Sequence, residues 1–243
     1  MTTTLPPVPQ ISFAGQAAAP PGPCDLVAMY VMHHAFRRDL RVFGAAVAAT
    51  PVGDRRTWRA LLGRWRRFSR VLHHHHSGED EALWPLLLSR ASADADRAAL
   101  QAMADEHEEI DPLLAGCAAG FERLASGPDE DERAALAVRL AATAERLGRH
   151  LGHEETDAMA VLQAHLTPSE WDGMHPAFAR HYSVGDMVFT VSWVLDGLPA
   201  DQRRTVQRFL GIPLTATGHV LRWPHHWRER RIFRYVRPAG VGG

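Results

Sequence analysis

The sequence predicts an all-α protein in which four long helices are followed by a C-terminal α-helical extension. Apolar residues recur at three- and four-residue steps, the period of an amphipathic helix, as in Trp58, Leu61, Leu62, Trp65 and Phe68. No stretch alternates apolar and polar residues with enrichment in β-branched residues, so little or no sheet is expected. The four long stretches have short connections, which make consecutive helices antiparallel neighbours.

The first helix is expected over residues 25–49, with Asp25 as its N-cap and a Pro- and Gly-containing segment at 50–53 after its end. The second helix is expected from about residue 55 to residue 92. Pro85 lies inside this stretch, so we expect it to kink or loosen the helix.

The third helix is expected from residue 94 to about 127, with a bend at Pro112, and the fourth from residue 129 to 166. Thr167 and Pro168 then predict the cap and the first residue of a short fifth helix.

The extension over residues 167–243 differs in kind from the four long helices. Short helices are expected over 184–195, 200–210 and 213–220, and glycines and prolines interrupt the rest. Its end is basic and aromatic: Trp223, Trp227, Arg228, Arg230, Arg231, Phe233, Arg234 and Tyr235. We expect the extension to pack on the bundle or on a protein partner that the sequence does not identify.

A leader over residues 1–24 precedes a bundle that we place at residues 25–166. The leader carries no charged side chain and has six prolines, so it resembles neither a signal peptide nor a membrane helix. We expect it to be extended, disordered or packed along the surface. A net charge of −1 gives no reason to expect nucleic acid or membrane as a partner. Two isolated cysteines indicate a reducing, cytoplasmic location.

The most informative pattern is a duplicated arrangement of histidines and glutamates. His33 precedes a His75-x-x-x-Glu79 pair, and His107 precedes a His150-x-x-x-Glu154 pair. The offset between the two copies is 74 residues for the lone histidines and 75 for each member of the pairs. Residues four apart share one helix face, so each pair can bind one metal ion or bridge two.

Together the two copies offer four imidazoles and two carboxylates. This set suits iron, manganese or zinc, whereas calcium and magnesium prefer oxygen ligands. Six ligands exceed the need of one tetrahedral zinc ion, so two metal ions that share the carboxylates use the set better. The metal ligands predicted from the sequence are His33, His75, Glu79, His107, His150 and Glu154.

Other histidines offer alternative registers. His76 and Asp80 are also four apart, but the 75-residue offset places Leu151 opposite His76, so we favour His75 with Glu79. His73, His74 and His76 are therefore expected to support the site or lie at the surface. His33 is favoured over His34 because it aligns Phe36 with Ile110, and His153 has no counterpart in the first copy.

With these residues, the chain resembles the hemerythrin-like HHE cation-binding proteins over about residues 25–165, and in particular the H-HxxxE-H-HxxxE pattern of actinobacterial members. The flanking segments Leu83-Trp84-Pro85 and Glu154-Glu155 add to the resemblance. It implies an up-down-up-down four-helix bundle and two iron ions with an oxo or hydroxo bridge, with zinc or manganese as substitutes. The four histidines would be terminal ligands, and Glu79 and Glu154 would bridge the irons.

The chain departs from the oxygen carriers of the family at two positions. The carriers have a further histidine on the third helix where this chain has Asp111, and their last carboxylate falls at the position of Glu155. Fewer histidines and more carboxylates favour an oxidising centre over a reversible O₂ carrier. Tyr30 lies one turn before His33 and is either a core aromatic or a hydrogen-bond donor to the site, whereas Trp84 is expected to pack.

We therefore expect a non-haem di-iron protein that reacts with hydrogen peroxide, O₂ or nitric oxide in oxidative or nitrosative stress defence. Catalase-like or peroxidase-like turnover is left open. The alternatives are an iron- or oxygen-responsive sensor without turnover, and a bundle that uses zinc or manganese for structure or storage. The chain has no GxSxG motif, Walker loop or dinucleotide-binding glycine motif.

Overall fold

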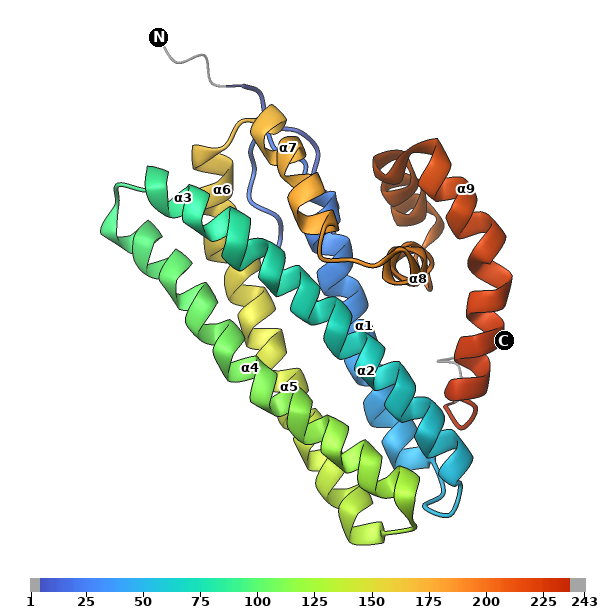
Figure 1. Ribbon diagram of the computed structural model, residues 1–243. Helices are drawn as coiled ribbons and strands as arrows, with labels where there is room; N and C mark the ends of the chain where they lie inside the picture. The colour runs from blue at the N-terminus through green and yellow to red at the C-terminus, as the bar shows by residue number, and fades with distance from the viewer. Residues whose placement is uncertain (1–4, 237–243) are drawn as a thin grey trace.

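A computed structural model describes residues 5–236 and shows an all-α protein, with no strand in that range. Four helices form the bundle: α1 (Val27–Ala49), α2 (Arg55–Gly78), α4 (Asp94–Ser126) and α5 (Glu130–His153). In Figure 1 they run alternately up and down, with α1 beside α5, α2 beside α4 and α4 beside α5. The predicted fold class is confirmed. Within the described residues, no helix combines the length and apolar content needed to cross a membrane.

Side-chain caps start four of the described helices. The carboxylate of Asp54 accepts a hydrogen bond from the backbone N–H of Thr57 at 3.1 Å, and Asp129 caps α5 in the same way. The predicted cap of the first helix is wrong by one residue: the N-cap of α1 is Leu26. Asp25 precedes that cap, and its carboxylate accepts from the N–H of Val27 at 3.0 Å.

Each helix that carries a His-x-x-x-Glu pair contains a wide turn that begins at the glutamate of the pair. α2 continues through a π-helical turn, η1 (Glu79–Leu83), into α3 (Trp84–Arg90). α5 continues through η2 (Glu154–Ala158) into α6 (Met159–His165). In each π turn the backbone N–H of the next residue donates to a carbonyl five residues back. The two π turns are separated by the same 75 residues as the pairs, and such turns occur frequently at functional sites.

Proline does not explain these turns. η1 precedes Pro85, where loosening was expected, but Ala160 occupies the equivalent position after η2. The feature common to both π turns is the glutamate that begins each of them. α4 also runs through Pro112 as a single helix.

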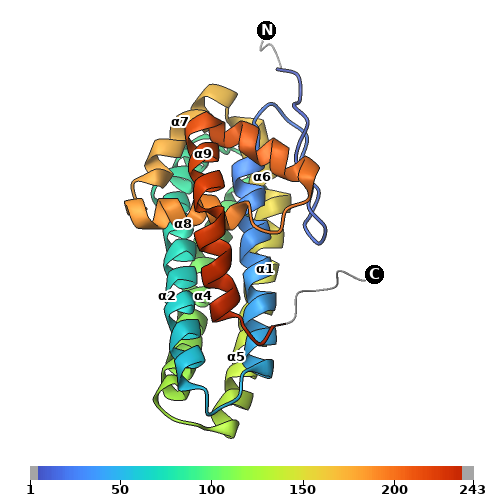
Figure 2. The ribbon, with the colours of Figure 1, turned by 90° about the vertical axis from the view of Figure 1, so that its right-hand side faces the viewer.

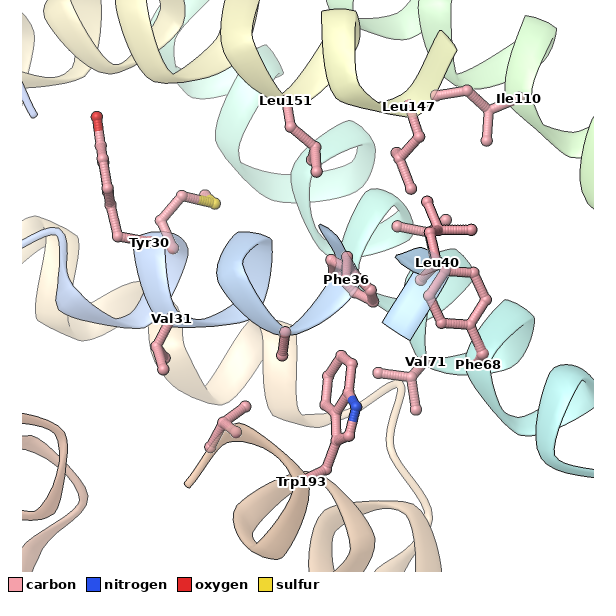
Figure 3. Close-up of a cluster of buried hydrophobic side chains, with 14 of the residues drawn as sticks. Tyr30, Val31, Phe36, Leu40, Phe68, Val71, Ile110, Leu147, Leu151 and Trp193 are labelled. Carbon is pink, nitrogen blue, oxygen red and sulfur yellow. The ribbon is translucent and has the colours of Figure 1, made fainter. Parts of the chain in front are cut away.

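Aromatic side chains fill the bundle core between α1 and α2. Phe36 packs edge-on against Phe68 at a ring distance of 5.8 Å, and Phe43 packs in the same way against Trp65 at 5.0 Å. Trp193 from the extension contacts Phe36 from the other side (Figure 3). The extension and the bundle therefore share one hydrophobic core. Burial of each of these large side chains contributes about 2–3 kcal/mol to stability.

The extension consists of α7 (Pro168–Ala179), α8 (Val184–Val194) and α9 (Ala200–Ile232). Figures 1 and 2 show these helices on the α1 and α2 side of the bundle. Thr167 and Glu170 form the predicted capping box of α7. The two helices expected at 200–210 and 213–220 are joined in α9 across a kink at Gly211, whose φ of 72° lies in the left-handed region. α9 then continues through Pro224 to Ile232.

A buried arginine holds α9 to the bundle. The Nε of Arg64 in α2 lies 3.1 Å from the carboxylate of Glu229 in α9, and its Nη2 pairs with Asp39 of α1. The guanidinium also lies 4.8 Å from the ring centre of Phe189 in α8. The positive charge of Arg64 is thus paired with two carboxylates, as a buried charge requires. Its contact with the Phe189 ring adds a cation–π interaction.

Residues 5–24 of the leader pack along the bundle, one of the three arrangements that the composition left open, and residues 1–4 lie outside the described range. Phe13 is buried and stacks on the ring of His34 with 4.5 Å between ring centres. Gln10 donates to the carbonyl of Cys24 at 2.8 Å, which holds the leader beside the start of α1.

Candidate metal centre

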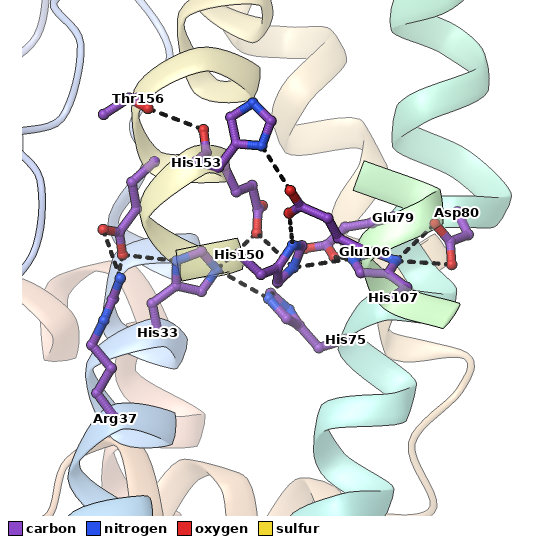
Figure 4. Close-up of polar contacts among 12 residues, drawn as sticks. His33, Arg37, His75, Glu79, Asp80, Glu106, His107, His150, His153 and Thr156 are labelled. Carbon is purple, nitrogen blue, oxygen red and sulfur yellow. Dashed lines mark hydrogen bonds and ion pairs between the residues drawn. The ribbon is translucent and has the colours of Figure 1, made fainter. Parts of the chain in front are cut away.

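Seven buried side chains converge in the middle of the bundle, in two adjoining groups. Figure 4 labels His33, His75, Glu79, His107 and His150 among them. Within each group the candidate ligand atoms lie within 4.8 Å of one another. One group is His33, His75, Glu79 and Glu154, and the other is His76, His107 and His150. The structure brings all six residues predicted from the sequence together and adds His76.

The two carboxylates join the two groups. The Glu79 carboxylate lies 3.1 Å from Nε2 of His75 and 3.7 Å from Nε2 of His107. The Glu154 carboxylate lies 3.2 Å from Nε2 of His33 and 3.9 Å from Nε2 of His150. Each glutamate therefore reaches an imidazole of both groups, which is the arrangement that bridging ligands need.

An outer set of carboxylates fixes three of the imidazoles. Nδ1 of His33 lies 2.9 Å from Glu155, that of His107 lies 2.9 Å from Asp80, and that of His150 lies 2.8 Å from Glu106. A carboxylate only accepts, so each Nδ1 carries the proton and donates it. In the neutral ring, each Nε2 then keeps its lone pair and points into the cluster, which is the tautomer that metal-bound histidines need.

This arrangement fits a metal better than a hydrogen-bond network. The Nε2 atoms of His107 and His150 lie 3.2 Å apart, but both are acceptors and cannot bond to each other. All four carboxylate oxygens of Glu79 and Glu154 are buried, and none accepts a hydrogen bond within the described part of the chain. Buried acceptors without donors are costly, and a cation would satisfy all of them at once.

The electrostatics of the two glutamates point the same way. Burial and the neighbouring charge of Glu154 raise the pKa of Glu79 well above its ordinary value. Glu79 therefore favours its protonated form, whereas the charge of His33 outweighs burial and lowers the pKa of Glu154 to about 2. A bound cation would favour the ionised form of both carboxylates. The mixture of imidazole and carboxylate donors suits iron, manganese or zinc.

His76 is the site residue that the sequence reasoning missed. Its ring stacks on that of His107, with 3.9 Å between centres and 6° between planes, and its buried Nε2 has no hydrogen-bond partner among the described residues. The internal repeat could not identify it, because Leu151 stands at the equivalent position. His76 can be assigned to the cluster only from the structure, which shows it buried beside His107 and His150.

The remaining candidates lie outside the cluster. His34 stacks on Phe13, and His153 bonds to the outer carboxylate Glu106 at 3.0 Å. Asp111 is exposed. The hydroxyl of Tyr30 donates to the backbone carbonyl of Glu155 at 3.1 Å, so it supports the outer shell of carboxylates and does not enter the cluster.

The structure also separates the two adjacent glutamates of the second pair. Glu154 enters the cluster, whereas Glu155 turns toward His33 and forms a bidentate pair with Arg37. The leader contributes as well: Gln16 donates to Glu155 at 2.8 Å, and the backbone N–H of Ala17 donates at 3.2 Å. Nothing in the leader's composition signals this contact.

One protein family, described as the hemerythrin HHE cation binding domain, matches residues 25–162. The match covers more than half of the 243-residue chain and includes all seven residues of the cluster. No curated protein and no solved structure matches the chain. The helical bundle, the convergent histidines and glutamates and the family match agree: the chain belongs to the hemerythrin HHE cation-binding domain family.

Proposed function

We propose that the cluster holds two metal ions, which are iron in the native protein. His33 and His75 would bind one ion, and His107 and His150, joined by His76, would bind the other. Glu79 and Glu154 would bridge the ions. The observation that carries this proposal is the position of each glutamate within 3.1–3.9 Å of an imidazole nitrogen in both groups.

We further propose that this centre reacts with hydrogen peroxide, O₂ or nitric oxide in the cytoplasm, as part of oxidative or nitrosative stress defence. Bound iron would supply one-electron redox chemistry and open positions for a small ligand. The protein residues restrict access, because every member of the cluster is at most 5% exposed and only small molecules can reach it.

The outer carboxylates support an oxidising role. Glu155, Asp80 and Glu106 each accept a hydrogen bond from the N–H at Nδ1 of a cluster histidine. This hydrogen bond makes the Nε2 of the same ring a stronger ligand for a metal ion. Anionic, strongly donating surroundings favour the more highly charged state of a metal. The expectation from the sequence rested partly on fewer histidines than in the oxygen carriers. His76 restores a fifth imidazole, so the proposal now rests on the outer carboxylates.

Anaerobic loading with iron, followed by spectra on addition of hydrogen peroxide, O₂ and nitric oxide in turn, tests both proposals. We expect two irons per chain and peroxide consumption over repeated additions. A Glu79→Ala/Glu154→Ala double variant should lose iron while circular dichroism shows an intact bundle, and His34→Gln, outside the cluster, should retain it. Full iron binding and peroxide consumption in the double variant would refute the site, and a stable reversible O₂ adduct would refute the oxidising role.

A sensor without turnover is the second candidate, and the position of the extension favours it over structural zinc or manganese. α7, α8 and α9 all pack on α1 or α2, the helices that carry His33 and His75. Metal binding could therefore change how tightly the extension is held. Limited proteolysis with and without iron tests this, and equal cleavage rates in the extension would refute the sensor.

A further inference from the structure

A nearly apolar cavity of about 250 Å³ lies between the extension and α1, next to the metal centre. Its wall includes Met32 of α1, Phe178 of α7, Val191 of α8 and Phe209 of α9. His75 also lines it, so the face of this imidazole that turns away from the cluster borders the cavity. The extension thus creates a partly open cavity against one residue of the centre.

The second copy of the repeat has a different residue at the position equivalent to Met32. There His150 is supported by Glu106, which lies one residue before His107. The equivalent residue of the first copy, one before His33, is Met32, and Met32 lines the cavity. An apolar side chain and a cavity therefore stand in the first copy where the second has a carboxylate hydrogen-bonded to its histidine.

The cavity contains unused hydrogen-bonding groups but no charge. Nε2 of His175 and Oγ1 of Thr190 are buried, and neither has a hydrogen-bond partner within residues 5–236. Both residues line the cavity, and no acidic or basic side chain other than histidine does so among the described residues. Burial lowers the pKa of His175 below its ordinary value, so its ring is neutral at pH 7. A charged guest would have no counter-ion here.

We propose that this cavity binds a small, uncharged and mostly apolar molecule with one hydroxyl group, held between the extension and His75. An apolar cavity of about 150 Å³ accommodates benzene, so this one has space for roughly ten non-hydrogen atoms. The hydroxyl would pair with His175 and Thr190, whose polar atoms are otherwise buried and unsatisfied. The proposal does not depend on which metal the centre holds or on its reactivity.

Calorimetric titration of the full-length protein with 1-naphthol, and with naphthalene as the analogue without the hydroxyl, tests the proposal. We expect 1-naphthol to bind one site per chain. Thr190→Val removes the hydroxyl at similar volume and should weaken 1-naphthol binding about fivefold, with little effect on naphthalene. Equal effects on both compounds would refute the role of Thr190, and absence of 1-naphthol binding to the unaltered protein would refute the site.

Filling the cavity locates the binding. Ala28→Trp places an indole in the cavity from α1 and should lower 1-naphthol affinity about tenfold or more. Ala45→Trp, at an exposed position of the same helix, is the matched control and should bind normally. Because Ala28→Trp can impair folding, Ala179→Trp at the exposed rim gives a second measurement. Unchanged affinity in both cavity variants would refute the location.

Discussion

The two halves of the bundle build the same structure around the centre of the cluster and differ behind it. In both copies a lone histidine, a His-x-x-x-Glu pair and a π turn follow one another at the same spacing. Their outer carboxylates cross over: Glu155 of the second copy supports His33 of the first, and Asp80 of the first supports His107 of the second. The symmetric features include the six cluster residues that the repeat relates to one another.

The two copies differ in two places. One is the side of the bundle that the extension covers, and the other is a histidine that only the first copy adds to the cluster. In the second copy His150 is hydrogen-bonded to Glu106, whereas in the first copy His75 and Met32 line the apolar cavity. His76 enters the cluster where the second copy has Leu151. The repeat therefore carries the residues of the cluster, whereas the cavity proposed to bind a ligand lies beside the first copy, at the position of Met32.

The largest expected effect separates the two adjacent glutamates of the second copy. Glu154→Gln should reduce the metal content from two ions per chain to one or none, because Glu154 reaches both groups. Glu155→Gln should retain two ions and weaken metal affinity about 10–100-fold, since Glu155 supports His33 without entering the cluster. Chelator competition with elemental analysis measures both, and the reverse order would assign the bridge to Glu155.

Removal of the anchor of the extension should cost stability without loss of the cluster. Arg64→Ala leaves Glu229 buried without its partner and Asp39 paired only with Arg38, which is expected to destabilise the protein by about 3 kcal/mol. Urea unfolding measures the free energy, and Arg66→Ala, an exposed arginine of the same helix, is the control. A loss below about 1 kcal/mol would show that the pair does not hold α9.

Exchange of Glu106 and Met32, which occupy equivalent positions in the two copies, tests the difference between the copies. Glu106→Met should weaken metal binding about 10–100-fold, because His150 loses its acceptor. Met32→Glu should abolish 1-naphthol binding, since it places a carboxylate in the cavity wall. Metal affinity and calorimetry are measured on both variants. If Met32→Glu binds 1-naphthol normally, Met32 does not distinguish the two halves in the way proposed.

The smallest expected effect concerns the attachment of α8. Burial alone would raise the pKa of Asp186, but hydrogen bonds with Arg70 and Ser183 outweigh it and lower the pKa below its ordinary value. A lowered folded-state pKa stabilises the protein above the unfolded pKa of about 3.9, and this contribution disappears as pH falls.

Asp186→Asn should therefore cost about 1 kcal/mol at pH 7 and progressively less below about pH 4, because its carboxylate pairs with Arg70 and accepts a hydrogen bond from Oγ of Ser183, the residue that caps α8. Urea unfolding at both pH values is the measurement, and Asp201→Asn, exposed in the first turn of α9, is the control. An effect independent of pH would show that the charge of Asp186 does not contribute.

The sequence predicted the parts of this structure that repeat or that depend on local geometry. The four long helices follow from apolar periodicity, and the six site residues follow from i,i+4 spacing and a constant offset. His76 escaped detection because it occurs in only one copy. The π turns and the bond from Gln16 to Glu155 escaped because they depend on tertiary contacts, which neither helix propensity nor composition records.

The crossed carboxylates have a consequence for how the protein is made. During synthesis the first repeat leaves the ribosome without Glu155, so His33 has no partner to fix its proton until the second repeat follows. Separately produced halves would likewise each lack the acceptor for their lone histidine, and mixing them should restore both. The centre is therefore a product of late, long-range assembly, and neither half can mature alone.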